Sequence, residues 1–152
     1  RQQPVAGDLR FISAAMKVVT DVERIGDHAA DIAEIVPHLA GVRKAGDPAV
    51  SRSIEMGRKA HKMLQDAMSA FAAEDEAAAK AVIDADDAVD YDFNTIKRML
   101  AAEIAAAPGK VDAALDVLMV IKYLERIGDH AVNIAEWVEF LRTGRYHHEK
   151  MF

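Results

Sequence analysis

The sequence of 152 residues contains no cysteine and few aromatic residues, and each scarcity narrows the possible folds and sites. Without cysteine there is no disulfide, thiolate zinc finger, iron–sulfur cluster or cysteine nucleophile, so oxygen or imidazole ligands must hold any bound metal. Aromatic residues make up only 6%, which argues against most β-sandwiches and barrels. Long apolar runs and a basic-then-apolar leader are also missing. These observations predict a cytoplasmic protein with no membrane insertion.

Positive charge is scarce as well. The 19 Lys and Arg residues against 25 Asp and Glu residues give a formal net charge of −6 at pH 7. Such a chain has no positive field to attract DNA, RNA or anionic lipid, so we expect no nucleic-acid partner. The hydrophobic share of 51% is too high for a disordered chain, and the length corresponds to one domain.

The apolar residues recur at the spacing of long amphipathic helices. From Pro4 to Leu39 the predicted core face is Val22, Ile25, Ala29, Ile32, Val36 and Leu39. Asp47 is the predicted N-cap of a second helix. The predicted core face of this helix is Ile54, Gly57, His61, Leu64, Met68 and Phe71. A third helix carries Val82, Ala85, Val89, Phe93, Ile96 and Leu100 and stops before Pro108, and a fourth carries Leu124, Ile127, Ala131, Ile134, Val138 and Leu141 and ends at Gly144. Short connections between long helices predict an all-α antiparallel bundle.

One twelve-residue segment occurs twice. Residues 23–34 read E-R-I-G-D-H-A-A-D-I-A-E and residues 125–136 read E-R-I-G-D-H-A-V-N-I-A-E, which is identity at 10 of 12 positions with an offset of 102 residues. The repeat predicts that the first and fourth helices are equivalent members of two three-helix units. Residues 1–41 would then be the last helix of a first, incomplete unit, residues 46–144 a complete second unit, and residues 145–152 a frayed tail.

The repeated segments carry polar residues four apart, on one helical face. These are Glu23, Asp27 and Asp31 in the first copy and Glu125, Asp129 and Asn133 in the second, and the third helix adds Asp86 and Asp90. Acidic pairs at this spacing repel, and a mid-helix glycine such as Gly26 or Gly128 costs about 1 kcal/mol relative to alanine. Facing rows of carboxylates on antiparallel helices suit hard cations. The alternative is a solvated acidic face paired with Arg24 and Arg126.

The sequence resembles the PhoU family of phosphate-specific transport system accessory proteins. The motifs that carry the resemblance are Arg1-Gln2-Gln3-Pro4-Val5-Ala6 with Asp8-Leu9-Arg10, the two E-R-I-G-D-H-A segments, and Asn133-Ile134-Ala135-Glu136. Family members consist of two three-helix repeats. The resemblance therefore implies a PhoU-like three-helix repeat with one additional long helix from the preceding repeat, whose first two helices are missing here.

The resemblance also implies a multinuclear iron or zinc cluster, with other divalent ions in some members. By position its ligands would be Asp86, Asp90, Glu125 and Asp129, with Asn133 a weaker candidate. Glu23, Asp27 and Asp31 would form half of a second site, whose partner acids would lie in the missing segment.

The implied role is negative regulation of phosphate uptake and of the phosphate-starvation response. The implied partners are the ATPase of the phosphate transporter and a sensor histidine kinase, and no catalysis is required. The exposed seam of the first helix, which includes Val22, Ile25, Ile32 and Val36, further predicts a homo-oligomer such as a homodimer.

Two other classes of protein compete with this interpretation. A carboxylate-bridged di-metal oxidoreductase of the helical-bundle type relies on Glu-x-x-His, and no glutamate in the sequence has a histidine three residues later. A metal-free helical interaction module would bind only water and arginine along its acidic rows. Nucleotide hydrolysis through a G-x-x-x-x-G-K-[ST] loop is excluded because the sequence has no such motif.

Overall fold

The structure, a computed structural model, describes residues 2–146, with side chains from residue 5 onward. It contains four α-helices, α1 (Gln2–Leu39), α2 (Pro48–Ala73), α3 (Glu76–Ala106) and α4 (Val111–Thr143), and a short 3-10 helix η1 (Pro108–Lys110). Within residues 2–146 there is no β-strand, and a single bridge between Ala40 and Arg43 tightens the α1–α2 connection. The predicted all-α fold is confirmed.

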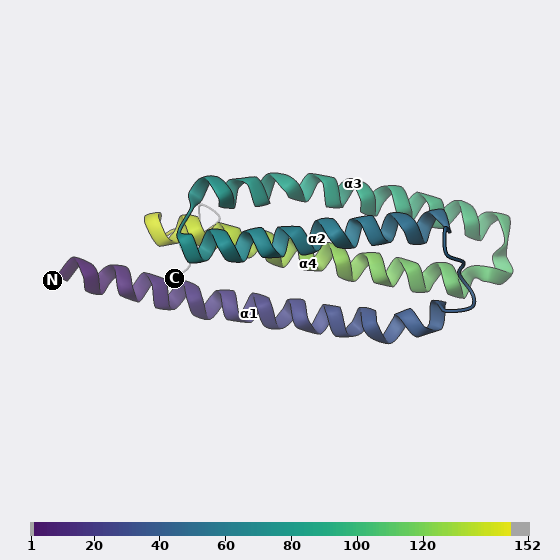
Figure 1. Cartoon of the computed structure of the whole chain (residues 1–152), viewed down its shortest axis with the longest axis horizontal. Coiled ribbons are helices and arrows are strands. Elements are labelled where there is room, and N and C mark those ends of the chain that lie inside the picture. Colours follow the sequence, from purple (N-terminus) through teal and green to yellow (C-terminus); the bar gives the residue numbers. More distant parts are fainter. Residues whose placement is uncertain (1, 147–152) are drawn as a thin grey trace.

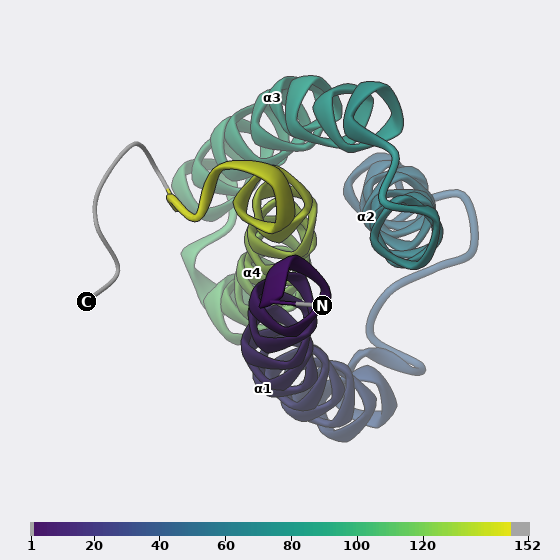
Figure 2. The same ribbon diagram turned by 90° about the vertical axis from the view of Figure 1, so that its left-hand side faces the viewer.

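The four helices run antiparallel to their neighbours in sequence, with α4 in the centre (Figure 1). Helix α4 packs against α1, α2 and α3, and α2 also packs against α3. Viewed along the bundle, α1 lies on the side of α4 away from α3 (Figure 2). Among the described residues no Cα atom of α1 comes within 8 Å of one in α2, so α1 is joined to the three-helix unit mainly through α4. Phe11 of α1 also stacks on Phe71 of α2 with ring centroids 5.7 Å apart.

The helix ends follow the local signals in the sequence. The carboxylate of Asp47 accepts hydrogen bonds from the backbone N–H groups of Ala49 and Val50 at 2.9 and 3.2 Å, as an N-cap does. Gly144 ends α4 with a φ of 71°, which glycine adopts without strain. Helix α1 continues two residues past Pro37.

The predicted core face of α2 is wrong. The residues buried against α3 and α4 are Ala49, Ser53, Met56, Ala60, Met63, Ala67, Ala70 and Phe71. Of the predicted face only Phe71 is among them, whereas Ile54 and Met68 are 51% and 40% exposed. The helix has two apolar stripes, and its alanine-rich stripe allows the closer approach to the neighbouring helices. The stripe with the larger side chains is left on the side toward α1.

Helix α1 buries only part of its predicted face. Ile25 is buried and Ile32 packs against the core, but Val22 and Val36 are 39% and 51% exposed. The N-terminal half adds further exposed apolar side chains on its outer side, namely Val5, Leu9, Ile12, Met16 and Val19. We call these five residues the outer seam of α1.

The frayed tail predicted from residue 145 does not include Tyr146. This side chain is buried and stacks on Trp137 with ring centroids 4.0 Å apart, because the turn at Gly144 directs the chain back onto α4. The rest of the predicted tail, residues 147–152, lies outside the described residues. None of the described helices has a stretch long and apolar enough to cross a membrane.

Candidate metal-binding site

The four predicted acids Asp86, Asp90, Glu125 and Asp129 lie along the interface of α3 and α4, near enough to influence one another's charge. Burial raises the pKa of Asp86 to about 6, and the negative charges of Asp90 and Asp129 add to the rise. The pKa values of Asp90 and Asp129 are also raised, by partial desolvation and then by the charge of Glu125. The pKa values of Asp86, Asp90 and Asp129 are therefore raised in part by neighbouring carboxylates across the interface, as the antiparallel arrangement of α3 and α4 predicts.

Gly128 places α4 directly beneath this cluster. A Cβ atom built on Gly128 would lie 3.5 Å from Oδ1 of Asp86 and 3.6 Å from Cγ1 of Val89. The glycine thus leaves room for the Asp86 carboxylate against the α4 backbone. Its equivalent in the first repeat, Gly26, has nothing within 4 Å of the same position, because its side of α1 is open.

The cluster is only partly neutralised. Nζ of Lys122 lies 2.8 Å from Oε1 of Glu125 and lowers the pKa values of Asp90 and Asp129, although not enough to cancel their rise. Oδ1 of Asp86 is buried and has no hydrogen-bond partner among the residues that the structure describes. Since the folded-state pKa of Asp86 is about 6 against an ordinary 3.8, the folded protein binds more protons than the unfolded chain between these values. The contribution of Asp86 to stability therefore falls as the pH rises through that window.

The carboxylate oxygens of the four acids are suitable ligands for a divalent cation, but in this structure the side chains do not converge on one point. Within residues 2–146 no three His, Asp or Glu side chains stand close enough together to hold an ion. The set consists only of carboxylate oxygens, and Oδ1 of Asp86 is free to accept a ligand bond. Binding would require the carboxylates to turn inward and Lys122 to release Glu125, so a metal role for these residues stays a prediction.

Asn133, the weaker candidate, forms a hydrogen bond with a residue of α1 and none with the four acids. Its Nδ2 donates to Oδ1 of Asp21 on α1 at 3.3 Å, and Nδ1 of His130 lies 2.8 Å from the same oxygen. Asp21 is only 8% exposed and was not among the residues predicted from the sequence. The signal was present, because Asp21 interrupts the apolar spacing between Val18 and Ile25 on the buried face of α1.

The two repeats meet at their own motifs. The rings of His28 and His130 lie 5.6 Å apart between α1 and α4, and His28 also stacks on Tyr123. Burial lowers the pKa of His28, and the charges of His130 and Arg126 lower it further. The equivalent histidines therefore mark the junction of the two repeats, on a side of α4 other than that of the acid cluster.

The acids of the first repeat have no facing partner among the described residues. Glu23 and Asp27 are exposed on α1, Asp31 is half-buried, and Nη1 of Arg24 lies 4.0 Å from Oδ2 of Asp27. The half-site expected there from the sequence stays a prediction.

A comparison with protein families matches residues 1–36 and 54–138 to the PhoU domain. The chain belongs to the PhoU family. It is 39% identical over 145 residues to a protein of Clostridium acetobutylicum named phosphate-specific transport system accessory protein PhoU homolog, covering 95% of this chain and 65% of the relative. The Pseudomonas aeruginosa protein of the same name is 38% identical over 146 residues, covering 95% and 59%. This PhoU-family chain thus spans less than two thirds of the length of these relatives.

Solved PhoU structures share the fold. The crystal structure of PhoU from Pseudomonas aeruginosa superposes with a TM-score of 0.86 at 36% identity, covering 95% of this chain and 69% of that one. The PhoU regulatory protein of Streptococcus pneumoniae gives a TM-score of 0.80 at 28% identity, covering 92% and 65%. The PhoU-like bundle predicted from the sequence is confirmed.

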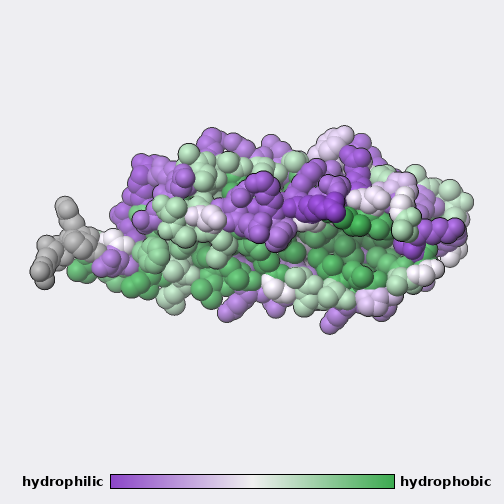
Figure 3. Space-filling view, in the orientation of Figure 1, coloured by the Kyte–Doolittle hydropathy of each residue, from purple (hydrophilic) through white to green (hydrophobic). Residues whose placement is uncertain are grey.

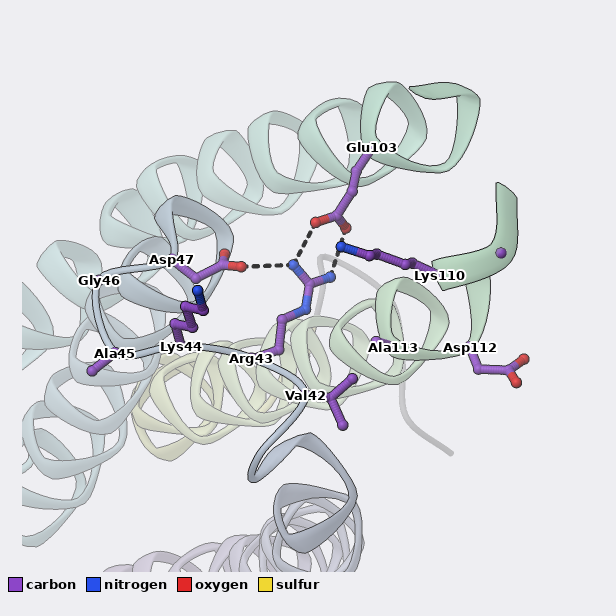
Figure 4. A pocket seen from close by; sticks show the side chains of 11 residues that line it. Val42, Arg43, Lys44, Ala45, Gly46, Asp47, Glu103, Lys110, Asp112 and Ala113 are labelled. Atoms are coloured by element: carbon purple, nitrogen blue, oxygen red, sulfur yellow. Dashed lines mark hydrogen bonds and ion pairs between the residues drawn. The ribbon is translucent and has the colours of Figure 1, made fainter. Parts of the chain in front are cut away.

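The PhoU domain match omits residues 37–53, which include the α1–α2 connection. Here the guanidinium of Arg43 donates two hydrogen bonds of 2.6 Å to Glu103 and one of 2.8 Å to Asp47 (Figure 4). Only 7% of the Arg43 side chain is exposed. The guanidinium fixes the connection to the end of α3, beside a cavity of about 570 Å³ that Lys44 and Lys110 also line.

Proposed function

We propose that this chain is a regulatory component of a phosphate-uptake system, acting as a negative regulator of uptake and of the phosphate-starvation response. The observation that carries the proposal is the PhoU domain match across residues 1–36 and 54–138, together with relatives named as accessory proteins of phosphate-specific transport. The proposed role requires no catalytic step.

The proposed partners are the cytoplasmic ATPase of the phosphate transporter and a sensor histidine kinase. A rigid bundle with a net charge of −6 offers these partners an acidic surface, which favours contact with basic surfaces. Regulation by contact would then depend on the shape and charge of the bundle.

We further propose that Asp86, Asp90, Glu125 and Asp129 hold a multinuclear iron or zinc cluster. Bound cations would supply the positive charge that the repelling carboxylates lack, and would link α3 to α4. The raised pKa of Asp86 and its unpartnered oxygen support this assignment. Glu23, Asp27 and Asp31 would contribute to a second site only when facing acids are supplied.

A metal-free interaction module remains a second candidate, favoured by the ion pair of Lys122 with Glu125 inside the cluster. A homo-oligomer also stays a prediction. Of the seam predicted to form its contact surface, Val22 and Val36 are 39% and 51% exposed and Ile25 is buried. The outer seam of α1, where Leu9 and Met16 are 63% and 68% exposed, would add to that surface.

Deletion of the gene for this chain in its source organism tests the regulatory proposal. We expect phosphate uptake and starvation-induced gene expression to rise in phosphate-rich medium, because the restraint on both is lost. Re-expression of the chain should restore the restraint. Unchanged uptake and expression after deletion would contradict the proposed role.

Elemental mass spectrometry of untagged protein tests the metal proposal. We expect about one or two iron, zinc or manganese ions per chain, and their loss when Glu125 and Asp129 are both changed to alanine. A matched control changes Asp112 and Glu139, two exposed acids of the same helix, and should keep the metal. Circular dichroism checks that both variants stay helical. Protein without metal before any substitution would favour the metal-free module and leave the regulatory proposal standing.

A further inference from the structure

A lysine lies next to the carboxylates along the interface of α3 and α4. Nζ of Lys122 is 2.8 Å from Oε1 of Glu125 and 5.4 Å from the centre of the Phe93 ring. Lys122 precedes Glu125 by three residues on α4, and Phe93 follows Asp90 by three residues on α3. Each therefore shares a helical face with the neighbouring acid. The ammonium group thus contacts a carboxylate on one side and faces an aromatic ring on the other, and both attract a cation.

The charge of Lys122 acts on more than one acid. Burial and then the charge of Glu125 raise the pKa values of Asp90 and Asp129, and the charge of Lys122 opposes the rise at both. The lysine side chain is 42% exposed, whereas that of Glu125 is 16% exposed. A lysine has a long flexible stem, so its ammonium group is able to move into water while the carboxylate stays between the helices.

The first repeat has no lysine at the equivalent position. With the offset of 102 residues, Lys122 corresponds to Thr20 and Glu125 corresponds to Glu23. The Thr20 hydroxyl donates to the backbone carbonyl of Met16 on its own helix at 3.2 Å. The repeated motif therefore does not require a positive charge here. The lysine belongs to the repeat whose carboxylates face one another across α3 and α4.

We propose that Lys122 is the internal counter-cation of the four acids Asp86, Asp90, Glu125 and Asp129, and that a divalent metal ion binds there by displacing its ammonium group from Glu125. The inference rests on the metal site proposed above and identifies the residue that sets its affinity. A divalent ion carries twice the charge of the ammonium group, so the carboxylates favour the exchange. The Phe93 ring attracts the released ammonium group and keeps it near Glu125 for its return when the metal leaves.

Titration with Mn²⁺, followed by the electron paramagnetic resonance signal of the free ion, tests the proposal. Lys122→Met removes the charge and keeps a long unbranched side chain. We expect its dissociation constant for Mn²⁺ to be lower than that of the parent protein by about tenfold or more, because the ion no longer competes with an ammonium group. Lys122→Arg retains the positive charge and should bind Mn²⁺ no more tightly than the parent protein.

Urea unfolding with and without metal separates this exchange from a merely structural role. In chelator, Lys122→Met should unfold at a lower urea concentration than the parent protein, because the carboxylates have lost their counter-cation. With saturating Mn²⁺ the difference should disappear or reverse, because the ion replaces the lost charge and stabilises the folded state that binds it. A structural role alone would lower the midpoint equally in both conditions, and that result would contradict the proposal.

The matched control is Lys62→Met, which removes the same charge from α2. Hydrophilic side chains gather along α2 on the face shown in Figure 3, and the Lys62 side chain is 75% exposed and pairs with Asp66 on its own helix. This variant should bind Mn²⁺ within about twofold of the parent protein. Circular dichroism checks that every variant is folded.

The outcomes distinguish the exchange from the metal site itself. Equal Mn²⁺ affinity of the parent protein and Lys122→Met would overturn the exchange and leave the metal site in place. No Mn²⁺ binding by either protein would overturn the metal site and the exchange with it. Binding by Lys122→Met alone would support the exchange, since the lysine then excludes the ion from the parent protein. Tighter binding that persists when Glu125 and Asp129 are also changed to alanine would place the ion elsewhere and overturn the proposal.

Discussion

Replacing Arg43 with alanine is expected to lower the free energy of unfolding by about 3 kcal/mol. Removing one partner of a buried ion pair costs about 3–5 kcal/mol, because the remaining charges lose their compensation. The variant leaves the carboxylates of Asp47 and Glu103 near each other without the guanidinium. Their side chains are 19% and 35% exposed, and water will screen part of the repulsion, which places the effect at the lower end of the range.

Urea unfolding at neutral pH, followed by circular dichroism, measures this loss. Lys44→Ala is the control. This neighbouring lysine is exposed and has no ion-pair partner within the described part of the chain, so its removal should change stability by less than about 0.5 kcal/mol. A loss for Arg43→Ala as small as that of the control would mean that the α1–α2 connection is held by its apolar contacts alone.

The same contact gives the fold an acid-sensitive component. Burial by itself would raise the pKa of Asp47, but the hydrogen bonds from Arg43 and from the backbone N–H of Val50 outweigh it, and the pKa is lowered. A carboxyl group with a lowered folded-state pKa stabilises the fold above its ordinary pKa of 3.8. This contribution is lost as the pH falls through the lower folded-state value. In Arg43→Ala, the hydrogen bond that helps to lower the pKa of Asp47 is absent. A fall in pH below 3.8 should therefore reduce the stability of this variant less than that of the parent protein.

The sequence predicted those features that depend on local signals. Helix periodicity, the Asp47 cap and the Gly144 turn gave the four helices and their ends, because each signal acts within one or two turns. The antiparallel arrangement of α3 and α4 was enough to place Asp86 and Asp90 near Glu125 and Asp129, in the middle part of both helices.

The features that were missed depend on contacts between distant residues. The choice between the two apolar stripes of α2 was made by packing, since the small side chains of Ala60 and Ala67 fit against the neighbouring helices and the larger Ile54 does not. The pairing of Arg43 with Glu103 spans 60 positions and leaves no periodic trace in the sequence. Asp21 occupies a position where the helical pattern expects an apolar residue. It could have been predicted only by treating such a polar residue as a candidate for burial.

The equivalent glycines of the two repeats, Gly26 and Gly128, lie in different surroundings. The same substitution at Gly26 is therefore a control for the substitution at Gly128. Gly128→Leu is expected to lower the free energy of unfolding by about 2 kcal/mol or more, since the added side chain would press on Asp86, Val89 and Met63 in a packed interior. Gly26→Leu has open space at the same position. It should raise stability by about 0.5–1 kcal/mol through better helix propensity.

Thermal unfolding of the two variants at several protein concentrations measures this contrast. Steric contact of the new leucine with Asp86 should also displace the α3 carboxylates from Glu125 and Asp129. If the parent protein binds metal, Gly128→Leu should therefore lose it, whereas Gly26→Leu should keep it. A Gly26→Leu variant destabilised as strongly as Gly128→Leu would mean that the open side of α1 is covered in solution. A concentration-dependent loss would then identify a second copy of the chain as the cover, because only an intermolecular contact responds to dilution.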